Sequence, residues 1–529
     1  MLVRLAVLLA LLLALPASAI EGRFPRAGPS APDTDIVEDP WVDCSELDDP
    51  AFTPVDVTSA SDLHTVAMAN CGSGCILELA PGTYTDTNVI FGDTALTTTY
   101  SKTASVSPSG EVVIRGSDPS NPPILQAEIG VNAAIIHAKD ITPRIRLEDV
   151  ILDGRRSEQT TGARTACTDT TPNNGICDTG SQTSTDANGF YTRNTLGGST
   201  RSCLLRVQVR NTVSTGIQLT RPFASTVQDS TVTGAGCTVA LCTPLAVPLD
   251  ATTNSVTKTA QGVQLSGGSD SAVVNTTISD VTKIGIECFT NSRRCQFHNN
   301  TIDGAGIAGI IFNEGDGTAS GNTITDTGFT YTPNTTSDNV GIGIQVINGN
   351  TYAASRFSTR LEGNTIDNAW GAGIQIGLAG TTYNDMRVDL TRNIVRGACN
   401  GTTRANSAGI ELGDSTYDIA QITASYNSNT DDSCVDGMRV RNVRTHRNNF
   451  NGTQNGLEVD DVDEFQGRDL DVVGNIDIDA DSKGFIQRCT VSGMVLGSDG
   501  VQRPSCGETP GETVNTNWDA LVWDTDEWG

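Results

Sequence analysis

The residues with the clearest potential for chemistry occupy the third place of a short recurring phrase, in which glycine is followed by an apolar, a variable and a second apolar residue. Amides in such a row can bond sugar hydroxyls, carboxylates can exchange protons, and an arginine can bind a carboxylate or sulfate. The row predicts a face that follows an extended polysaccharide; the alternative is a solvated surface with ion pairs between neighbouring charges. In chain order the third residues are Gln218, Gln264, Glu287, Ile311, Gln345, Gln375, Glu411, Arg439 and Glu458.

Glycoside hydrolysis requires two carboxyl groups about 5 to 9.5 Å apart, the shorter separation giving retention and the longer giving inversion. On stacked strands this range corresponds to residues one or two coils apart. The best pair is Glu287 with Glu314 or Asp316, and Glu411 with Asp414 is a second pair. Because the chain has 62 acidic residues, a chance meeting of surface acids is the competing interpretation.

β-Elimination requires a cation beside the uronate, a base for the C5 proton and an acid for the leaving oxygen. Residues 439–447 form a basic island, and a smaller island lies at residues 293–298. A basic island is more informative in a chain with a net charge of -28 than in a basic protein, although pairing with nearby acids is the alternative. The candidate residues are Arg439, Arg441, His446, Arg293 and Arg294.

The elements that must position these residues are short strands, because apolar and polar residues alternate within each glycine phrase. Neighbouring phrases are mostly 19 to 36 residues apart, the period of a solenoid. A second phrase, beginning with asparagine, follows most copies and predicts a corner where asparagine side chains stack from coil to coil. These asparagines are Asn275, Asn300, Asn322, Asn364, Asn393 and Asn475.

With both phrases in place, the chain resembles the right-handed parallel β-helix of the pectate-lyase-like superfamily over residues 58–503. The resemblance implies an all-β, single-stranded solenoid with a short N-terminal capping helix, which we expect near residues 61–69. The Gly-Asp-Asp and Gly-His-Gly strings of polygalacturonases are missing, as are the Asp-Phe-Ile-Phe-Gly string of pectin methylesterases and the Asp-Pro-His-Asp string of mannuronan epimerases. The resemblance therefore implies the fold, and no catalytic residue is carried over from it.

The bulk properties limit the partners. Binding to nucleic acid or to an anionic membrane is not expected, because a net charge of -28 repels phosphate. A charged start, a short apolar run and Ala17-Ser18-Ala19 predict a signal peptide over residues 1–19, and no later stretch is apolar enough to span a membrane. We therefore expect a secreted or periplasmic protein with a polysaccharide partner. The sequence leaves its oligomeric state open.

The remaining segments complete the expected organisation. Residues 20–57 are acidic and proline-rich and predict a linker, whereas residues 504–529 predict a tail or C-terminal cap. Trp518, Trp523 and Trp528 lie in this tail, and a sugar-stacking strip is the alternative to a cap. Long polar excursions at residues 155–202, 237–259 and 329–340 are candidates for the walls of a groove.

The 14 cysteines behind a signal peptide predict loop-stapling disulfides rather than metal ligands, and no zinc spacing is present. No cofactor is firmly expected. Calcium is left open, because Asp477, Asp479 and Asp481 can supply oxygens from one strand face. Close cysteine pairs are Cys71 with Cys75, Cys167 with Cys177, Cys237 with Cys242, Cys288 with Cys295, and Cys489 with Cys506; Cys44, Cys203, Cys399 and Cys434 have no nearby partner.

Overall fold

The fold is seen in a computed structural model of the chain. The structure describes residues 41–92, 105–155, 190–193, 201–236, 261–328, 341–347, 357–376, 386–400, 408–412, 421–503 and 521–523, apart from short gaps inside several of these ranges. Residues 41–529 form one compact unit. None of the described helices is long and apolar enough to cross a membrane.

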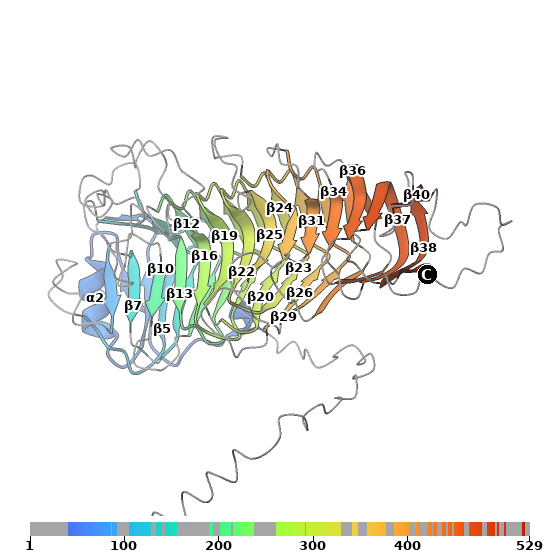
Figure 1. Cartoon of the computed structure of the whole chain (residues 1–529). Helices are drawn as coiled ribbons and strands as arrows, with labels where there is room; N and C mark the ends of the chain where they lie inside the picture. Colours follow the sequence, from blue (N-terminus) through green and yellow to red (C-terminus); the bar gives the residue numbers. More distant parts are fainter. Residues whose placement is uncertain are drawn as a thin grey trace, which may run out of the picture. The chain divides into compact units, whose positions relative to one another are not determined.

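The described strands form a solenoid in which each coil contributes one strand to each of three parallel sheets (Figure 1). Along most of its length each strand pairs with the strand three places further along the chain, for example β16 with β19 and β19 with β22. The all-β fold with stacked coils is thus confirmed. The first sheet consists of β4 (Val89–Phe91), β7 (Ile136–Lys139), β10 (Phe190–Arg193), β13 (Ile217–Thr220), β16 (Gln261–Ser266), β19 (Ile284–Phe289), β22 (Ala308–Asn313), β25 (Ile342–Ile347), β28 (Ile374–Ile376), β31 (Ala408–Leu412) and β34 (Asp436–Val440).

The second and third sheets complete each coil. The second sheet consists of β1 (Val55–Val57), β2 (Cys75–Leu79), β5 (Val112–Gly116), β8 (Ile145–Glu148), β11 (Ser202–Leu205), β14 (Thr226–Gln228), β17 (Ala272–Val274), β20 (Cys295–His298), β23 (Gly317–Ser320), β26 (Phe357–Glu362), β29 (Met386–Thr391), β32 (Gln421–Ser425) and β35 (Val443–His446). The third sheet consists of β3 (Thr83–Tyr84), β6 (Ile124–Gln126), β9 (Ile151–Asp153), β12 (Gln208–Arg210), β15 (Thr231–Thr233), β18 (Thr277–Ser279), β21 (Thr301–Asp303), β24 (Thr323–Thr325), β27 (Thr365–Asp367), β30 (Ile394–Arg396) and β33 (Ser428–Thr430).

The glycine of the recurring phrase is required by close packing inside the coil. A Cβ atom on Gly285 would lie 2.5 Å from the backbone oxygen of Gly309 and 2.6 Å from a methyl carbon of Ile302. The next apolar residue, Ile286, is fully buried in the same interior cluster as Ile302. Each phrase therefore places its glycine and apolar residues inward and its third residue on the outer face of the first sheet.

The predicted asparagine corner is an interior ladder between the second and third sheets. Asn300, Asn322, Asn364, Asn393 and Asn427 are each at most 2% exposed. Each of the first four donates its side-chain amide to the Oδ1 atom of the next asparagine, at 2.8 to 2.9 Å. Each amide also donates to a backbone carbonyl, and each Oδ1 after the first coil accepts a backbone N–H. The ladder thus pairs buried backbone groups as well as side chains.

The expectation for Asn275 was wrong by one residue. Thr276, which is fully buried, occupies the ladder position, and its backbone N–H donates to Asn300 Oδ1 at 3.0 Å. Asn275 instead adopts a left-handed backbone with φ 50° and donates to Asp229 on the exposed side. Asparagine tolerates this conformation, which explains why the sequence pattern placed it at the corner.

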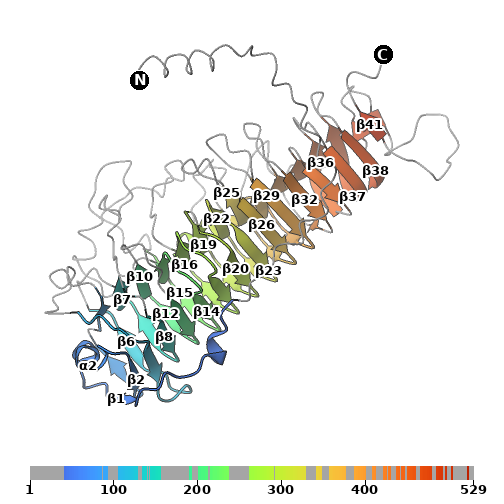
Figure 2. The ribbon, with the colours of Figure 1, turned by 90° about the horizontal axis from the view of Figure 1, so that it is seen from below.

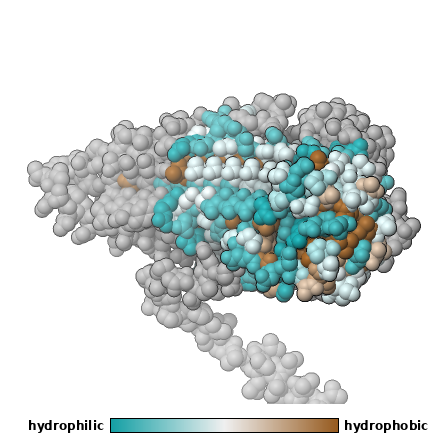
Figure 3. Space-filling view, turned by 180° about the vertical axis from the view of Figure 1, so that it is seen from behind, coloured by the Kyte–Doolittle hydropathy of each residue, from teal (hydrophilic) through white to brown (hydrophobic). Residues whose placement is uncertain are grey.

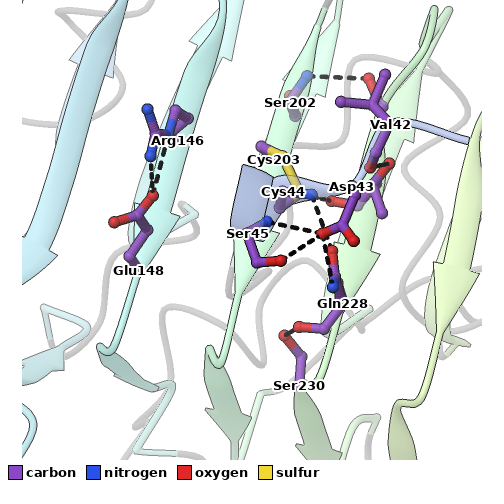
Figure 4. The surroundings of a disulfide bond; sticks show 12 residues. Val42, Asp43, Cys44, Ser45, Arg146, Glu148, Ser202, Cys203, Gln228 and Ser230 are labelled. Atoms are coloured by element: carbon purple, nitrogen blue, oxygen red, sulfur yellow. Dashed lines mark hydrogen bonds and ion pairs between the residues drawn. A yellow bond between two sulfur atoms is a disulfide. The ribbon is translucent and has the colours of Figure 1, made fainter. Parts of the chain in front are cut away.

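The N-terminal end is covered as expected by a short helix, α2 (Leu63–Asn70), which begins after Asp62 as its N-cap. Residues 42–49, here called the N-terminal strap, include the short 3₁₀ helix η1 (Cys44–Glu46). The strap lies across the outer face of the second sheet, where a disulfide joins Cys44 to Cys203 (Figure 4). Residues 41–57 fall in the range expected to be a linker, yet they pack on the solenoid and β1 pairs with β2.

Polar contacts hold the strap along its length. The backbone N–H of Cys44 donates to the Gln228 side chain at 2.9 Å. Arg146, only 3% exposed, donates to the backbone oxygen of Asp48 at 2.9 Å and to Glu148. Burial of a charge at this depth is tolerable because the guanidinium has several partners.

At the C-terminal end the strands lengthen, and β41 lies beside β38 (Figure 2). Two pairs in this region are antiparallel. The antiparallel pairs are β38 with β41 and β39 with β40. Gly484 thereby pairs with Trp523, which places one of the three tail tryptophans on the last coils. The strands are β36 (Asn449–Val459), β37 (Phe465–Ile478), β38 (Gly484–Val491), β39 (Val495–Leu496), β40 (Gln502–Arg503) and β41 (Leu521–Trp523).

Candidate functional site

The polar row predicted from the recurring phrase exists as one continuous register on the first sheet. Gln218 pairs with Gln264, and Gln264 pairs with Glu287. The same register continues without a slip through Ile311, Gln345, Gln375, Glu411, Arg439 and Glu458. Successive members are therefore one strand spacing apart, about 4.8 Å.

Hydrogen bonds divide this row into two relays, each running through two glutamines to a glutamate. In the first relay, Gln218 Nε2 donates to Gln264 Oε1 at 2.9 Å, and Gln264 Nε2 donates to Glu287 Oε2 at 2.8 Å. In the second relay, Gln345 donates to Gln375 at 2.8 Å, and Gln375 donates to Glu411 at 2.9 Å. A carboxylate can only accept, so it is a natural end for a chain of amide donors.

An apolar patch separates the two relays. Ile311 occupies the row position between Glu287 and Gln345 and is 4% exposed. It packs with Ile284, Ala308 and Ile342 in a small cluster distinct from the interior core. The patch places apolar groups directly beside the Glu287 carboxylate.

Glu287 is the most strongly positioned residue of the row. Its Oε2 atom accepts hydrogen bonds from Gln261 at 2.7 Å and from Gln264 at 2.8 Å. Its Oε1 atom makes no hydrogen bond with the part of the chain that the structure describes. Gln261 is itself held by Thr215 at 2.9 Å, so one oxygen of the carboxylate is fixed by a supported pair of amides.

The middle of the row is shielded, which the alternation of residues did not predict. Gln264, Glu287, Gln345 and Gln375 are 2 to 6% exposed, whereas Gln218 is half-buried. The interpretation of this part of the row as a solvated surface is therefore wrong. A shielded polar group must be paired, and the relays supply the pairing.

The first expected carboxylate pair lies in two separate networks. Asp316 accepts from the Arg293 guanidinium at 2.8 Å and from the Arg294 backbone N–H at 2.6 Å, in the turn after β22. Glu314 precedes it in that turn with φ 54°. No hydrogen bond among the described residues connects either acid to Glu287. Glu314 and Asp316 therefore remain proposals as its catalytic partners.

The two arginines expected to bind substrate take part in ion pairs at this turn. Arg293 pairs with Asp316, and Arg294 pairs with Asp270. Burial alone would raise the pKa of Asp270, but the hydrogen bonds from Arg294 and Ser269 and the Arg294 charge lower it overall. A disulfide between Cys288 and Cys295 closes the adjacent turn. These contacts give both arginines structural partners.

The remaining candidates lie near the C-terminal coils, where the structure defines backbone but few side chains. Arg439 pairs in register with Glu411 on one side and Glu458 on the other, the order that an ion ladder requires. His446 lies on the second sheet opposite Ser425. Arg441 and Asp414 lie outside the described residues, as do Asp479 and Asp481 of the calcium hypothesis. No group of three or more potential metal ligands occurs among the described residues.

The predicted disulfides Cys71–Cys75 and Cys288–Cys295 are confirmed. The Cys44–Cys203 bond was missed, because its partners are 159 residues apart in sequence. Disulfides are typical of an oxidising compartment. The pairs Cys167 with Cys177 and Cys237 with Cys242 lie outside the described residues, and the side chains of Cys489 and Cys506 are not described.

A serine and histidine pair was also missed. His298 of β20 and Ser320 of β23 lie side by side in the second sheet, and His298 Nδ1 is 2.6 Å from Ser320 Oγ. A signal was present in the sequence: Asn300 and Asn322 mark coils 22 residues apart, and the same step leads from His298 to Ser320.

The described face behind the view of Figure 1 is largely hydrophilic or intermediate, with apolar residues gathered mainly toward the N-terminal coils (Figure 3).

Comparison with known families gives one match, to "Right handed beta helix region", over residues 216–387. A comparison with curated proteins finds no match. Among solved structures, the chain is similar to the mannuronan C-5 epimerase A-module of Azotobacter vinelandii, at 13% identity over 83% of this chain and 95% of that chain, with a TM-score of 0.41.

Two further solved structures are similar at the same level. One is PfbA, a surface adhesin of Streptococcus pneumoniae, at 11% identity over 83% of this chain and 89% of that chain, with a TM-score of 0.40. The other is the catalytic unit of a GH87 α-1,3-glucanase from Streptomyces thermodiastaticus, at 14% identity over 91% of this chain and 72% of that chain, with a TM-score of 0.43. The sequence match over residues 216–387 and the coil-by-coil pairing of the described strands identify the fold as a right-handed parallel β-helix.

Proposed function

We propose that the protein is secreted, binds an extended polysaccharide along the outer face of the first sheet, and cleaves it with Glu287 as the acid–base group. The observation that carries the proposal is the state of the Glu287 carboxylate. Two amides fix Oε2, while Oε1 makes no hydrogen bond with the described residues. A general acid or base needs this combination of a fixed position and an oxygen that can exchange a proton with substrate.

The surroundings of Glu287 support this role. At 3% exposure the carboxylate is shielded from bulk water, and Ile311, which belongs to the same apolar cluster as Ile284, lies on the side that faces the second relay. Electrostatic interactions are stronger in a site from which water is excluded. Gln218 and Glu411, the half-buried ends of the two relays, are the members of the row most accessible to a sugar chain.

Two reaction classes fit a single positioned carboxylate, and they need different partners. Hydrolysis needs a second carboxyl group, for which Glu314 and Asp316 are the candidates. Elimination from an acidic polysaccharide needs a cation at the uronate, for which Arg439 and Arg441 are the candidates. The elimination hypothesis also includes His446 as a substrate-binding residue and a bound calcium ion as a cofactor.

A non-catalytic extracellular binding or structural module is the second candidate. The observation that favours it is the pairing within the relays, since a stack of bonded amides also serves as a stable surface. The second relay, from Gln345 through Gln375 to Glu411, fits this structural role because it does not include Glu287.

The test uses the purified protein with a panel of neutral, uronate-containing and sulfated polysaccharides, with and without calcium. Release of reducing ends alone indicates hydrolysis, and reducing ends with an absorbing unsaturated product indicate elimination. Glu287→Gln should abolish turnover and keep binding, while Glu411→Gln, the matched change at the end of the second relay, should retain turnover. Equal turnover of wild type and Glu287→Gln would refute the proposed role, and binding without turnover by the wild type would favour the module.

A further inference from the structure

A second constellation capable of chemistry lies on the outer face of the second sheet, away from the Glu287 row. His298 ends β20 and Ser320 ends β23, and these residues are register partners on adjacent coils. Their side chains are only partly buried, and His298 Nδ1 lies 2.6 Å from Ser320 Oγ. A hydroxyl at this distance from an imidazole nitrogen is the arrangement of a serine nucleophile with its base.

The other histidine nitrogen has a partner that fixes the tautomer. His298 Nε2 lies 3.4 Å from Gln296 Oε1, two residues earlier on the same strand. A side-chain carbonyl oxygen accepts only, so this contact favours the proton on Nε2 and leaves Nδ1 as the acceptor for Ser320. Gln296 is 8% exposed, and it therefore plays the part of a third group that orients the base.

A carboxylate with two guanidinium partners lies beside the serine on the next coil. Ser320 pairs in register with Glu362, whose carboxylate is held by Arg360 and Arg392, each at 2.6 Å. Arg360 pairs with Thr318, so it is diagonal to Ser320 on the same face. Long side chains reach diagonal neighbours on a sheet, and here both guanidinium groups are bound to the Glu362 carboxylate.

We propose that Ser320, His298 and Gln296 form an acyl-ester hydrolase site whose substrates are small acyl esters, such as O-acetyl groups on a glycan. Ser320 Oγ attacks the ester carbonyl carbon while its proton moves to His298 Nδ1. The bond to the alcohol oxygen then breaks, and the same proton passes to that oxygen. Water attacks the acyl-serine, gives one proton through Nδ1 back to Ser320 Oγ, and releases the carboxylic acid.

The site is chemically independent of the proposed glycan-cleaving carboxylate. Glu287 lies on the first sheet, and its hydrogen bonds are to Gln261 and Gln264 rather than to this constellation. Loss of one activity therefore leaves the other to be measured.

The experiment treats the purified protein with a fluorophosphonate probe, maps the labelled residue by mass spectrometry, and follows hydrolysis of p-nitrophenyl acetate and acetate release from acetylated xylan. We expect label on Ser320, and a loss of at least about 100-fold in hydrolysis for Ser320→Ala and His298→Gln. Ser279→Ala is the matched control, because Ser279 is another part-buried strand serine and bonds a hydroxyl instead of a histidine. That variant should hydrolyse the ester normally.

The proposal is overturned if folded wild-type protein takes no label at Ser320 and hydrolyses neither ester. It is also overturned if Ser320→Ala hydrolyses the ester as fast as wild type. Thermal unfolding of each variant is measured in parallel, and Ser320→Ala removes one oxygen from a partly exposed position, so that loss of folding is distinguishable from loss of the nucleophile. Gln296→Leu adds a readout of orientation: it should lower hydrolysis without preventing labelling of Ser320.

Discussion

The solenoid contains two stacks of amide side chains that differ in what they bond. The asparagine ladder lies inside the corner between the second and third sheets, and each of its central side chains bonds two backbone groups of the preceding coil as well as its asparagine neighbours. The glutamine relays lie on the outer face of the first sheet and, from residue to residue, bond only side chains.

We propose that this difference distinguishes a structural stack, the asparagine ladder, from a stack that belongs to a binding or catalytic site. Removing a ladder asparagine leaves buried backbone groups without partners, and such groups are costly wherever they occur. The relays are interrupted by Ile311 and end in carboxylates, so they do not run continuously from coil to coil as the ladder does. A polar stack that ends at a fixed carboxylate beside apolar groups has the properties of a site.

The largest expected effect is on the ladder. Asn364→Ala removes partners from the Asn322 amide, the Asn322 backbone N–H and the Ala319 carbonyl oxygen. At roughly 1 kcal/mol or more for each buried group, the local free energy of unfolding should fall by about 3 kcal/mol. Hydrogen exchange at the Asn322 amide measures this directly. Exchange as slow as in the wild type would mean that the ladder is not a structural element.

A smaller effect is expected in the relays. Gln264→Leu removes one of two donors from Glu287, and Gln375→Leu makes the matching break in the second relay. Each should cost about 1 to 2 kcal/mol by thermal unfolding, since a hydrogen bond to a charged group is worth more than a neutral one. Only Gln264→Leu should also reduce glycan turnover. Equal effects of both changes on turnover would remove the distinction between the relays.

Extending the ladder by one coil should stabilise the protein slightly. In Thr276→Asn the introduced amide can donate to Asn300 Oδ1, as the later asparagines do to their neighbours, and its own oxygen can accept the Ser230 backbone N–H. We expect a gain of about 0.5 to 1 kcal/mol, the typical net value of an added hydrogen bond. A clear decrease in the unfolding midpoint would show that this coil is too narrow for the ladder.

The smallest effect is expected at Asn275, which has the sequence signature of the ladder but lies outside it. Asn275→Gly removes its bond to Asp229 while keeping a residue suited to φ 50°. The unfolding free energy should change by less than about 0.5 kcal/mol, as for other exposed positions. A loss as large as that of Asn364→Ala would contradict the assignment of Thr276 to the ladder.

The row and most of the ladder could be predicted because, in a solenoid, residues that recur once per coil in the sequence lie side by side on neighbouring strands. The glycine phrase predicted every pairing from Gln218 to Glu458, and four ladder asparagines were identified correctly. The pattern could not predict the shielding of Glu287, because alternation distinguishes inner from outer faces and contains no information on what lies outside the sheet. The Cys44–Cys203 bond was unpredictable for a related reason: the strap joins coils far from it in sequence.

The sequence pattern also failed to predict the ion pairs at the turns between strands. Arg293 and Asp316 lie on adjacent coils in loops whose length varies, so their contact depends on turn geometry rather than on the coil period. His298 and Ser320 lie on strands and follow the period, and for that reason a strict 22-residue step would have found them.

The account is tested most directly by measuring polysaccharide turnover and the thermal unfolding midpoint on the same preparations of wild type, Glu287→Gln and Asn364→Ala. We predict that Glu287→Gln loses turnover by a factor of about 100 to 10,000, as for removal of a general acid or base, and unfolds near the wild-type temperature. Asn364→Ala should unfold at a clearly lower temperature and keep turnover per folded molecule. The reverse pattern, with Glu287→Gln active but destabilised, would show that the row serves only to support the fold.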